Sequence, residues 1–133
     1  MLEKFADMEL RYLGETIWVP ETKFGDYIGS GNGTITGDLL AGDIKWSLFE
    51  NEAPDVCDFS IVGTITDEAA VAHGFEILGY SQHEPDTRTW RLSAGIRFTS
   101  RPNDAAYPAV GVVTGVFETA SRTHRYELFR NTG

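Results

Sequence analysis

Two stretches of this sequence, residues 59–66 and 90–98, place apolar and polar side chains in alternation. From Trp90 to Phe98 every second residue is apolar, and arginine, serine and glycine stand between them. Successive side chains of a β-strand point to opposite faces, whereas a helix repeats every 3.6 residues. Each stretch is therefore predicted to be a strand with one face buried in a core.

The same pattern recurs along the chain and predicts eight or nine short strands with no helix. Strands of this kind in one chain form a sandwich or a barrel. Closing the sheet removes its exposed edges, and fourteen glycines supply the bends that strong curvature needs. We predict an all-β fold, one closed antiparallel β-barrel over residues 1–133. Its strands are expected at residues 33–40, 44–50, 59–66, 71–80, 90–98, 109–119 and 123–130, with one or two more within 8–19.

The run Gly29-Ser30-Gly31-Asn32-Gly33 resembles a phosphate-binding loop only superficially. Such a loop opens a helix whose N-terminus binds the phosphate. Here the glycines lead into Thr34-Ile35-Thr36, a β-branched run typical of a strand, and no Gly-Lys-Ser/Thr follows. We interpret the run as a glycine-rich turn.

The composition excludes several partners. Twenty acidic residues against eleven basic ones give a formal charge of −9, so neither nucleic acid nor an anionic membrane surface is an expected partner. No apolar run approaches the roughly 20 residues of a membrane span. The first residues lack the pattern of a secretory signal, and the single cysteine, Cys57, cannot form an internal disulfide. We expect a soluble, cytoplasmic protein.

Alternation places two histidines on inner faces of the predicted barrel. His73 shares a face with Phe75, and His124 shares one with Tyr126, although the inward face of the last two strands is left open. An imidazole beside a phenol can act as a general acid–base pair on a ketone, enol or epoxide. His73 and Tyr126 are the predicted catalytic residues. The alternatives are a core histidine satisfied by a neighbouring carbonyl group, or a strand register that leaves the histidine in solvent.

Aromatic residues dominate the predicted inner faces. They either fill the barrel or line a cavity for a small hydrophobic molecule, and an interior cavity above roughly 300 Å³ would favour the second interpretation. The histidines lack the spacing of a metal site, so no metal and no cofactor is predicted. The predicted ligand-binding residues are Trp46, Phe59, Phe75, Trp90, Phe98 and His124.

The order of several short segments resembles the family called domain of unknown function 3237, or UPF0311. The matching segments are Gly33 to Gly42, Asp43-Ile44-Lys45-Trp46, Thr64-Ile65-Thr66-Asp67, Ile96-Arg97-Phe98-Thr99, Tyr107 and Tyr126. The resemblance spans most of the chain. It implies a calycin-like antiparallel barrel, similar to allene oxide cyclase, that often self-associates and has no settled biochemical role.

Three functions are compatible with these observations. The first is a cofactor-independent isomerase, cyclase or lyase that acts on a small hydrophobic metabolite inside the barrel. The second is a non-catalytic carrier or sensor of such a molecule, and the third is a structural or assembly module. Outward-facing apolar residues such as Phe49 and Val62 are compatible with a homodimer.

Overall fold

The computed structural model describes residues 1–14, 17–19, 26–52 and 55–133, which form nine β-strands. The described residues contain no helix, and hence none long and apolar enough to cross a membrane. The strands are β1 (Leu2–Tyr12), β2 (Ile17–Val19), β3 (Asp26–Thr36), β4 (Gly42–Glu52), β5 (Val56–Thr66), β6 (Ala72–His83), β7 (Thr89–Ser100), β8 (Val110–Glu118) and β9 (Thr123–Asn131).

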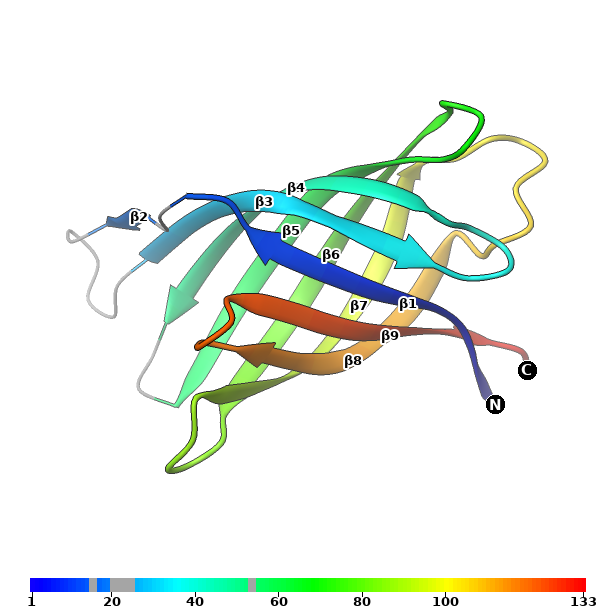
Figure 1. Ribbon diagram of the computed structural model, residues 1–133. Coiled ribbons are helices and arrows are strands. Elements are labelled where there is room, and N and C mark those ends of the chain that lie inside the picture. The colour runs from blue at the N-terminus through cyan, green and yellow to red at the C-terminus, as the bar shows by residue number, and fades with distance from the viewer. Residues whose placement is uncertain (15–16, 20–25, 53–54) are drawn as a thin grey trace.

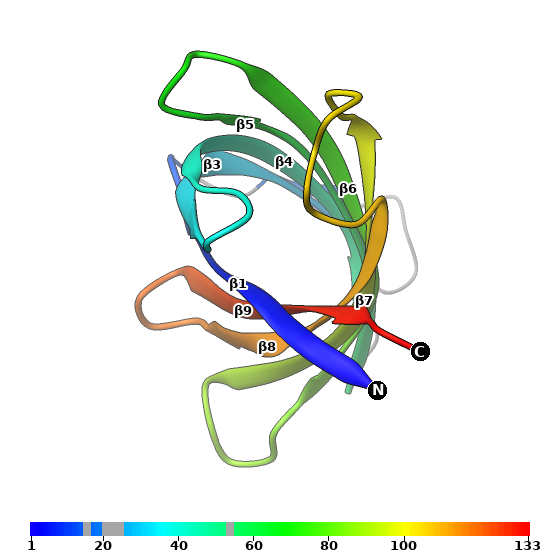
Figure 2. The ribbon, with the colours of Figure 1, turned by 90° about the vertical axis from the view of Figure 1, so that its right-hand side faces the viewer.

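Eight of these strands close into one antiparallel barrel (Figure 1). Strands β3 to β9 pair in sequence order, β9 pairs with β1, and β1 returns to pair with β3. The short strand β2 lies on the same edge of β3, beyond the end of β1. The view along the barrel shows the strands as a ring (Figure 2). The prediction of an all-β, closed antiparallel barrel is confirmed.

Closure depends on glycines that the sequence analysis interpreted as a turn, and that interpretation is wrong. Residues 29–33 lie within β3. A Cβ atom at Gly31 would lie 1.8 Å from the carbonyl oxygen of Arg11, and one at Gly33 would lie 2.1 Å from that of Glu9. Strand β1 crosses β3 too closely for any side chain at these two positions. The glycines therefore allow the first and third strands to meet and close the sheet.

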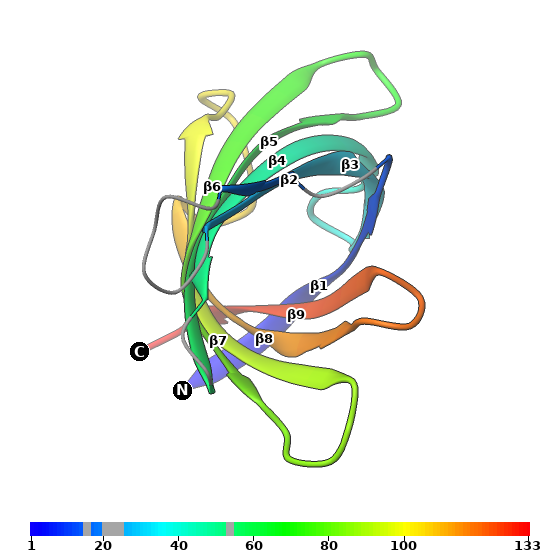
Figure 3. The same ribbon diagram turned by 90° about the vertical axis from the view of Figure 1, so that its left-hand side faces the viewer.

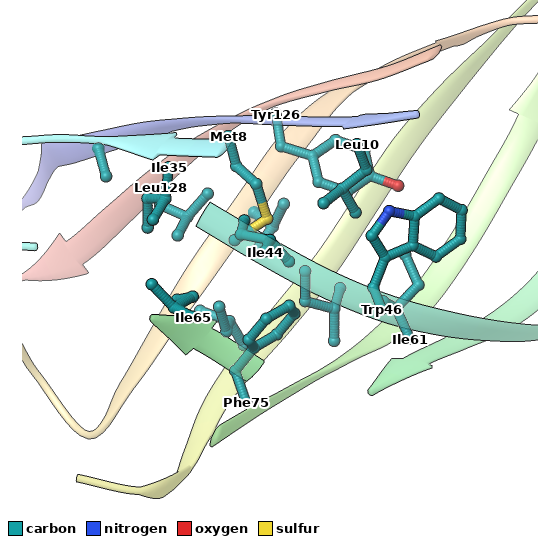
Figure 4. Packing of buried hydrophobic residues seen from close by; sticks show 14 of the residues in the cluster. Met8, Leu10, Ile35, Ile44, Trp46, Ile61, Ile65, Phe75, Tyr126 and Leu128 are labelled. Carbon is teal, nitrogen blue, oxygen red and sulfur yellow. The ribbon is translucent and has the colours of Figure 1, made fainter. Parts of the chain in front are cut away.

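Side chains fill the middle of the barrel (Figure 4). Met8, Ile61, Phe75 and Leu128 come from four different strands, and none is more than 2% exposed. The faces predicted from alternation are the faces observed, because residues such as Ile44, Ile65 and Ile96 are buried while Phe49 and Val62 on the outside are about half exposed. With its centre filled, the barrel has room for a ligand at its ends.

The two ends of the barrel differ in their connections (Figures 1 and 3). Both termini and the connections at 37–41, 67–71 and 101–109 lie at one end, which we call the terminal end. The turns at 84–88 and 119–122 lie at the other, which we call the hairpin end. Because neighbouring strands run in opposite directions, β6 starts at the terminal end and β9 starts at the hairpin end.

Candidate functional site: a chamber at the hairpin end

A cavity of about 350 Å³ opens into the barrel at the hairpin end, and we call it the aromatic chamber. Its volume lies at the lower end of the range of small-molecule sites, about 300–1,000 Å³. Most of its wall is aromatic or aliphatic, with a small number of polar groups. It is lined by Tyr12, Tyr27, Glu50, Cys57, Phe59, Ser81, Trp90, Leu92, Phe117, Thr119, Arg122 and His124.

An aromatic cluster forms one side of the chamber. The His124 ring stacks on Phe117 with the centroids 4.4 Å apart, and Tyr12 meets Phe117 edge to face at 5.7 Å. Trp46 packs against Tyr12 at 4.9 Å, and its indole nitrogen donates to the Asn32 carbonyl oxygen at 2.8 Å. These rings come from β1, β4, β8 and β9, so the barrel's closure brings them together.

His124 and Tyr126 form a buried hydrogen-bonded pair beside the chamber. The Tyr126 Oη atom lies 2.6 Å from His124 Nδ1, and both residues are at most 3% exposed. Burial lowers the pKa of His124 to about 3 and raises the pKa of Tyr126. At neutral pH both groups are therefore uncharged. A neutral imidazole carries one proton and accepts at its other nitrogen.

The tautomer of His124 follows from its partners. Within the described part of the chain, His124 Nδ1 is the only hydrogen-bond partner of Tyr126 Oη, and a buried phenol needs an acceptor for its proton. Tyr126 therefore donates to Nδ1, and the imidazole proton is on Nε2. That nitrogen lies 3.3 Å from Tyr12 Oη, to which it donates. Burial, reinforced by the negative charge of Glu50, raises the pKa of Tyr12, so this phenol is also protonated.

Two charged residues, Glu50 and Arg122, also line the chamber. The guanidinium carbon of Arg122 lies 5.3 Å from the centre of the Tyr12 ring, a cation–π contact. Arg122 has a φ of 53°, in the left-handed region that disfavours residues with a Cβ by about 1 kcal/mol. Its backbone is held by hydrogen bonds from Tyr12 N to its carbonyl oxygen and from its own N–H to Thr119, each 3.3 Å long. The strained turn places an arginine over the chamber wall.

A second polar cluster lies at the terminal end. His73 Nε2 lies 2.8 Å from Asp67 Oδ2, and His73 Nδ1 lies 2.6 Å from Tyr107 Oη. The hydrogen bond with His73 lowers the pKa of Asp67, and burial raises the pKa of Tyr107. Because a carboxylate only accepts, His73 donates through Nε2 and Tyr107 donates to Nδ1. Asp67 also accepts from the backbone N–H groups of Ala69 and Val71.

This second cluster ties loops to the barrel. It joins the 67–71 turn and the 101–109 loop to β6, and each ring nitrogen of His73 has a protein partner. A depression of about 560 Å³ lies above it, lined by residues of three connections. His73 is a core histidine whose partners are the Asp67 carboxylate and the Tyr107 phenol, and not the carbonyl group that the sequence analysis gave as the alternative. The aromatic chamber is the better candidate for a ligand site.

The structure separates the residues predicted as a catalytic pair. His73 is bonded to Tyr107 and Tyr126 to His124, because the starts of β6 and β9 lie at opposite ends of the barrel. Tyr126 shares the hairpin end with His124 but is not among the residues that line the chamber. The predicted pairing of His73 with Tyr126 is therefore wrong, while both are buried as predicted.

The predicted ligand-binding residues fall into three groups. Phe59, Trp90 and His124 line the aromatic chamber, and Trp46 packs behind its wall. Phe75 belongs to the filled centre, and Phe98 packs on Tyr107 at the terminal end with ring centroids 4.5 Å apart.

Sequence reasoning missed several residues of the chamber. Tyr12 lies on a strand that the sequence located only approximately, and Arg122 lies in a turn. Ser81 follows the predicted strand 71–80, and its alternation with His73 and Phe75 could have placed it inside.

Metal ligands do not cluster in the part of the chain that the structure describes, where no group of three His, Cys, Asp or Glu side chains could hold an ion.

The buried His124 predicts how stability depends on pH. Its folded-state pKa of about 3 is below the 6.5 of a free histidine, so between these values only the unfolded chain takes up the proton. Its contribution is complete above pH 6.5 and is lost as pH falls toward 3, at up to about 1.4 kcal/mol per pH unit. Between pH 7 and 5 we expect the free energy of unfolding to fall by about 2 kcal/mol through this group.

Urea unfolding at the two pH values measures this loss. The comparison is the double variant His124→Phe/Tyr126→Phe, which removes both hydrogen-bonding partners and the titrating ring. It should lose about 2 kcal/mol less than the natural protein between pH 7 and 5. An equal loss in both proteins would show that His124 is protonated normally in the folded state.

The molecule is therefore a closed eight-stranded antiparallel β-barrel with a cavity at one end. A protein of unknown function from Clostridium acetobutylicum ATCC 824 has a similar solved structure, with a TM-score of 0.82 over 97% of each chain. The two sequences are 10% identical, so the similarity shows the fold alone. The sequence matches no protein-family model, and no curated protein is significantly similar to it. The resemblance to domain of unknown function 3237 stays a prediction.

Proposed function

We propose that this protein binds a small, largely apolar molecule in the aromatic chamber. The observation that supports this most is the chamber itself, a cavity of about 350 Å³ beside a barrel centre that is otherwise filled. Small-molecule sites are concave, mainly apolar, and contain a few placed polar groups. The chamber has this composition. Its wall includes the rings of Phe59, Trp90 and Phe117, and its polar groups include the hydroxyl groups of Tyr12 and Ser81.

The proposal is confined to binding, as in a carrier or sensor. The predicted acid–base pair does not exist as a pair, and His124 is a neutral group whose two nitrogens are already engaged. An isomerase, cyclase or lyase activity would need a different pair of residues. A purely structural module is supported less, because it gives no reason for an open cavity lined by aromatic rings.

Equilibrium dialysis with 2-ethylnaphthalene tests the proposal. This two-ring hydrocarbon is smaller than the chamber volume of about 350 Å³, is apolar like most of the chamber wall, and carries no hydrogen-bonding group. We expect saturable binding of one molecule per chain, with an affinity in the micromolar range, because burying a small apolar ligand of this size supplies several kcal/mol. Uptake that does not saturate, or no uptake, would contradict the proposed function.

A further inference from the structure

The polar groups of the aromatic chamber indicate which chemical class of molecule it takes. Three groups, Tyr126, His124 and Tyr12, form a chain of hydrogen bonds that ends at the chamber wall. The direction of this chain is fixed at its buried end. Tyr126 donates to His124 Nδ1, and His124 Nε2–H donates to Tyr12 Oη.

This direction decides what Tyr12 offers to a ligand. Since its oxygen accepts the proton of His124, its own hydroxyl proton is left to donate, and no acceptor for it lies among the described residues. The Tyr12 ring contacts the rings of Trp46 and Phe117 and the guanidinium group of Arg122. The space that remains for an acceptor is the chamber, which Tyr12 lines.

Ser81 supplies an independent second donor. It is 6% exposed, lies opposite Cys57 and Leu92 on the inner face, and lines the same chamber. No hydrogen bond to its hydroxyl group is found among the described residues, and this oxygen is not a fully enclosed unpaired atom, so it is open to the chamber. Two hydroxyl donors from different strands therefore face one small apolar space.

The charges of the chamber favour a neutral acceptor over an anionic one. Glu50 and Arg122 both line it, so their formal charges cancel. A ligand carboxylate would gain no net attraction from this pair and would have to be desolvated among aromatic rings. A ketone or enone oxygen accepts two hydrogen bonds and carries no such penalty.

We propose that the ligand of the aromatic chamber is an apolar ketone or enone whose carbonyl oxygen accepts hydrogen bonds from Tyr12 and Ser81. This inference rests on the proposed function, because it names the class of molecule that the same cavity binds. It involves no covalent step.

A matched pair of probes tests the inference. The ketone 2-acetylnaphthalene and the hydrocarbon 2-ethylnaphthalene have nearly the same shape and differ in the carbonyl oxygen. The natural protein should bind the ketone about tenfold more tightly than the hydrocarbon, the amount expected for one to two hydrogen bonds in a buried site. Tyr12→Phe should remove most of that difference by weakening the ketone alone, and Ser81→Ala should remove a smaller part of it.

Two controls separate recognition from folding. Tyr80→Phe removes a hydroxyl group from an outer-face tyrosine that is 65% exposed, and it should leave both affinities unchanged. Unchanged hydrocarbon binding by Tyr12→Phe shows that this variant keeps its chamber. In the infrared spectrum of bound, carbonyl-13C-labelled ketone, the stretching frequency should be lower in the natural protein than in Tyr12→Phe.

The outcomes are distinguishable. Equal affinity for the two probes, or a Tyr12→Phe variant that weakens both equally, overturns the inference and leaves the proposed function in place. If neither probe binds, the proposed function fails and the inference fails with it. If Tyr12→Phe loses affinity for the ketone alone and the carbonyl stretching frequency is lower in the natural protein than in this variant, both the inference and the proposed function are supported.

Discussion

Gly31→Ala should lower the free energy of unfolding by about 3 kcal/mol or more, a large part of the 5–15 kcal/mol that keeps a domain folded. The new methyl group would lie 1.8 Å from the Arg11 carbonyl oxygen and 2.8 Å from the Trp46 ring. The carbonyl belongs to a strand paired with β3, so it cannot move without opening the junction of β1 and β3 that closes the barrel. Urea unfolding measures the effect.

Gly95→Ala is the matched control for this prediction. Gly95 also lies within a strand, but a Cβ atom there would have no neighbour closer than 3.7 Å. That substitution should be neutral or slightly stabilising, because alanine loses less backbone freedom on folding than glycine does. Equal stabilities of Gly31→Ala and Gly95→Ala would contradict the described approach of β1 to β3.

Ser81→Trp should abolish binding of 2-ethylnaphthalene, with an affinity at least a hundredfold lower than in the natural protein. Ser81 is an inner-face residue that lines the chamber, so an indole ring at this position occupies the space that the proposed ligand needs. The loss corresponds to about 3 kcal/mol of binding free energy. Equilibrium dialysis with the hydrocarbon measures it directly.

Ser47→Trp provides the comparison, since Ser47 is an exposed residue of β4 on the outside of the barrel. It adds the same indole without entering the chamber and should bind the hydrocarbon normally. Far-ultraviolet circular dichroism and urea unfolding establish that both variants are folded. Normal binding by folded Ser81→Trp would place the binding site outside the chamber.

The sequence predicted the barrel well because period-two alternation is a local property. In each strand from β4 to β7 the buried face can be identified from that strand's own sequence, through residues such as Trp46, Ile61 and Phe98. The sequences of the neighbouring strands are not needed. Closure was predicted from the absence of helices and from the number of strands and glycines. The particular role of Gly31 was missed, because the approach of β1 to β3 joins residues that are about twenty positions apart.

The site was less predictable because it depends on which ends of strands meet. Alternation placed His73 inside and put His124 and Tyr126 on one shared face, which is the buried face in the structure. Alternation does not tell which end of the barrel an inner residue occupies. The partners of His73, namely Asp67 and Tyr107, lie in a turn and a loop whose positions no periodic pattern determines. Tyr12 becomes part of the chamber only through closure of the barrel.

The most direct test of the central claim is the location of the bound probe by nuclear magnetic resonance. Isotope-filtered nuclear Overhauser effects between unlabelled 2-ethylnaphthalene and the 13C-labelled protein report which side chains lie beside the ligand. Ligand uptake in the aromatic chamber predicts contacts with the methyl groups of Leu92 and the ring of Phe117. Contacts confined to outer-face methyl groups, such as those of Val62 and Leu78, would contradict it.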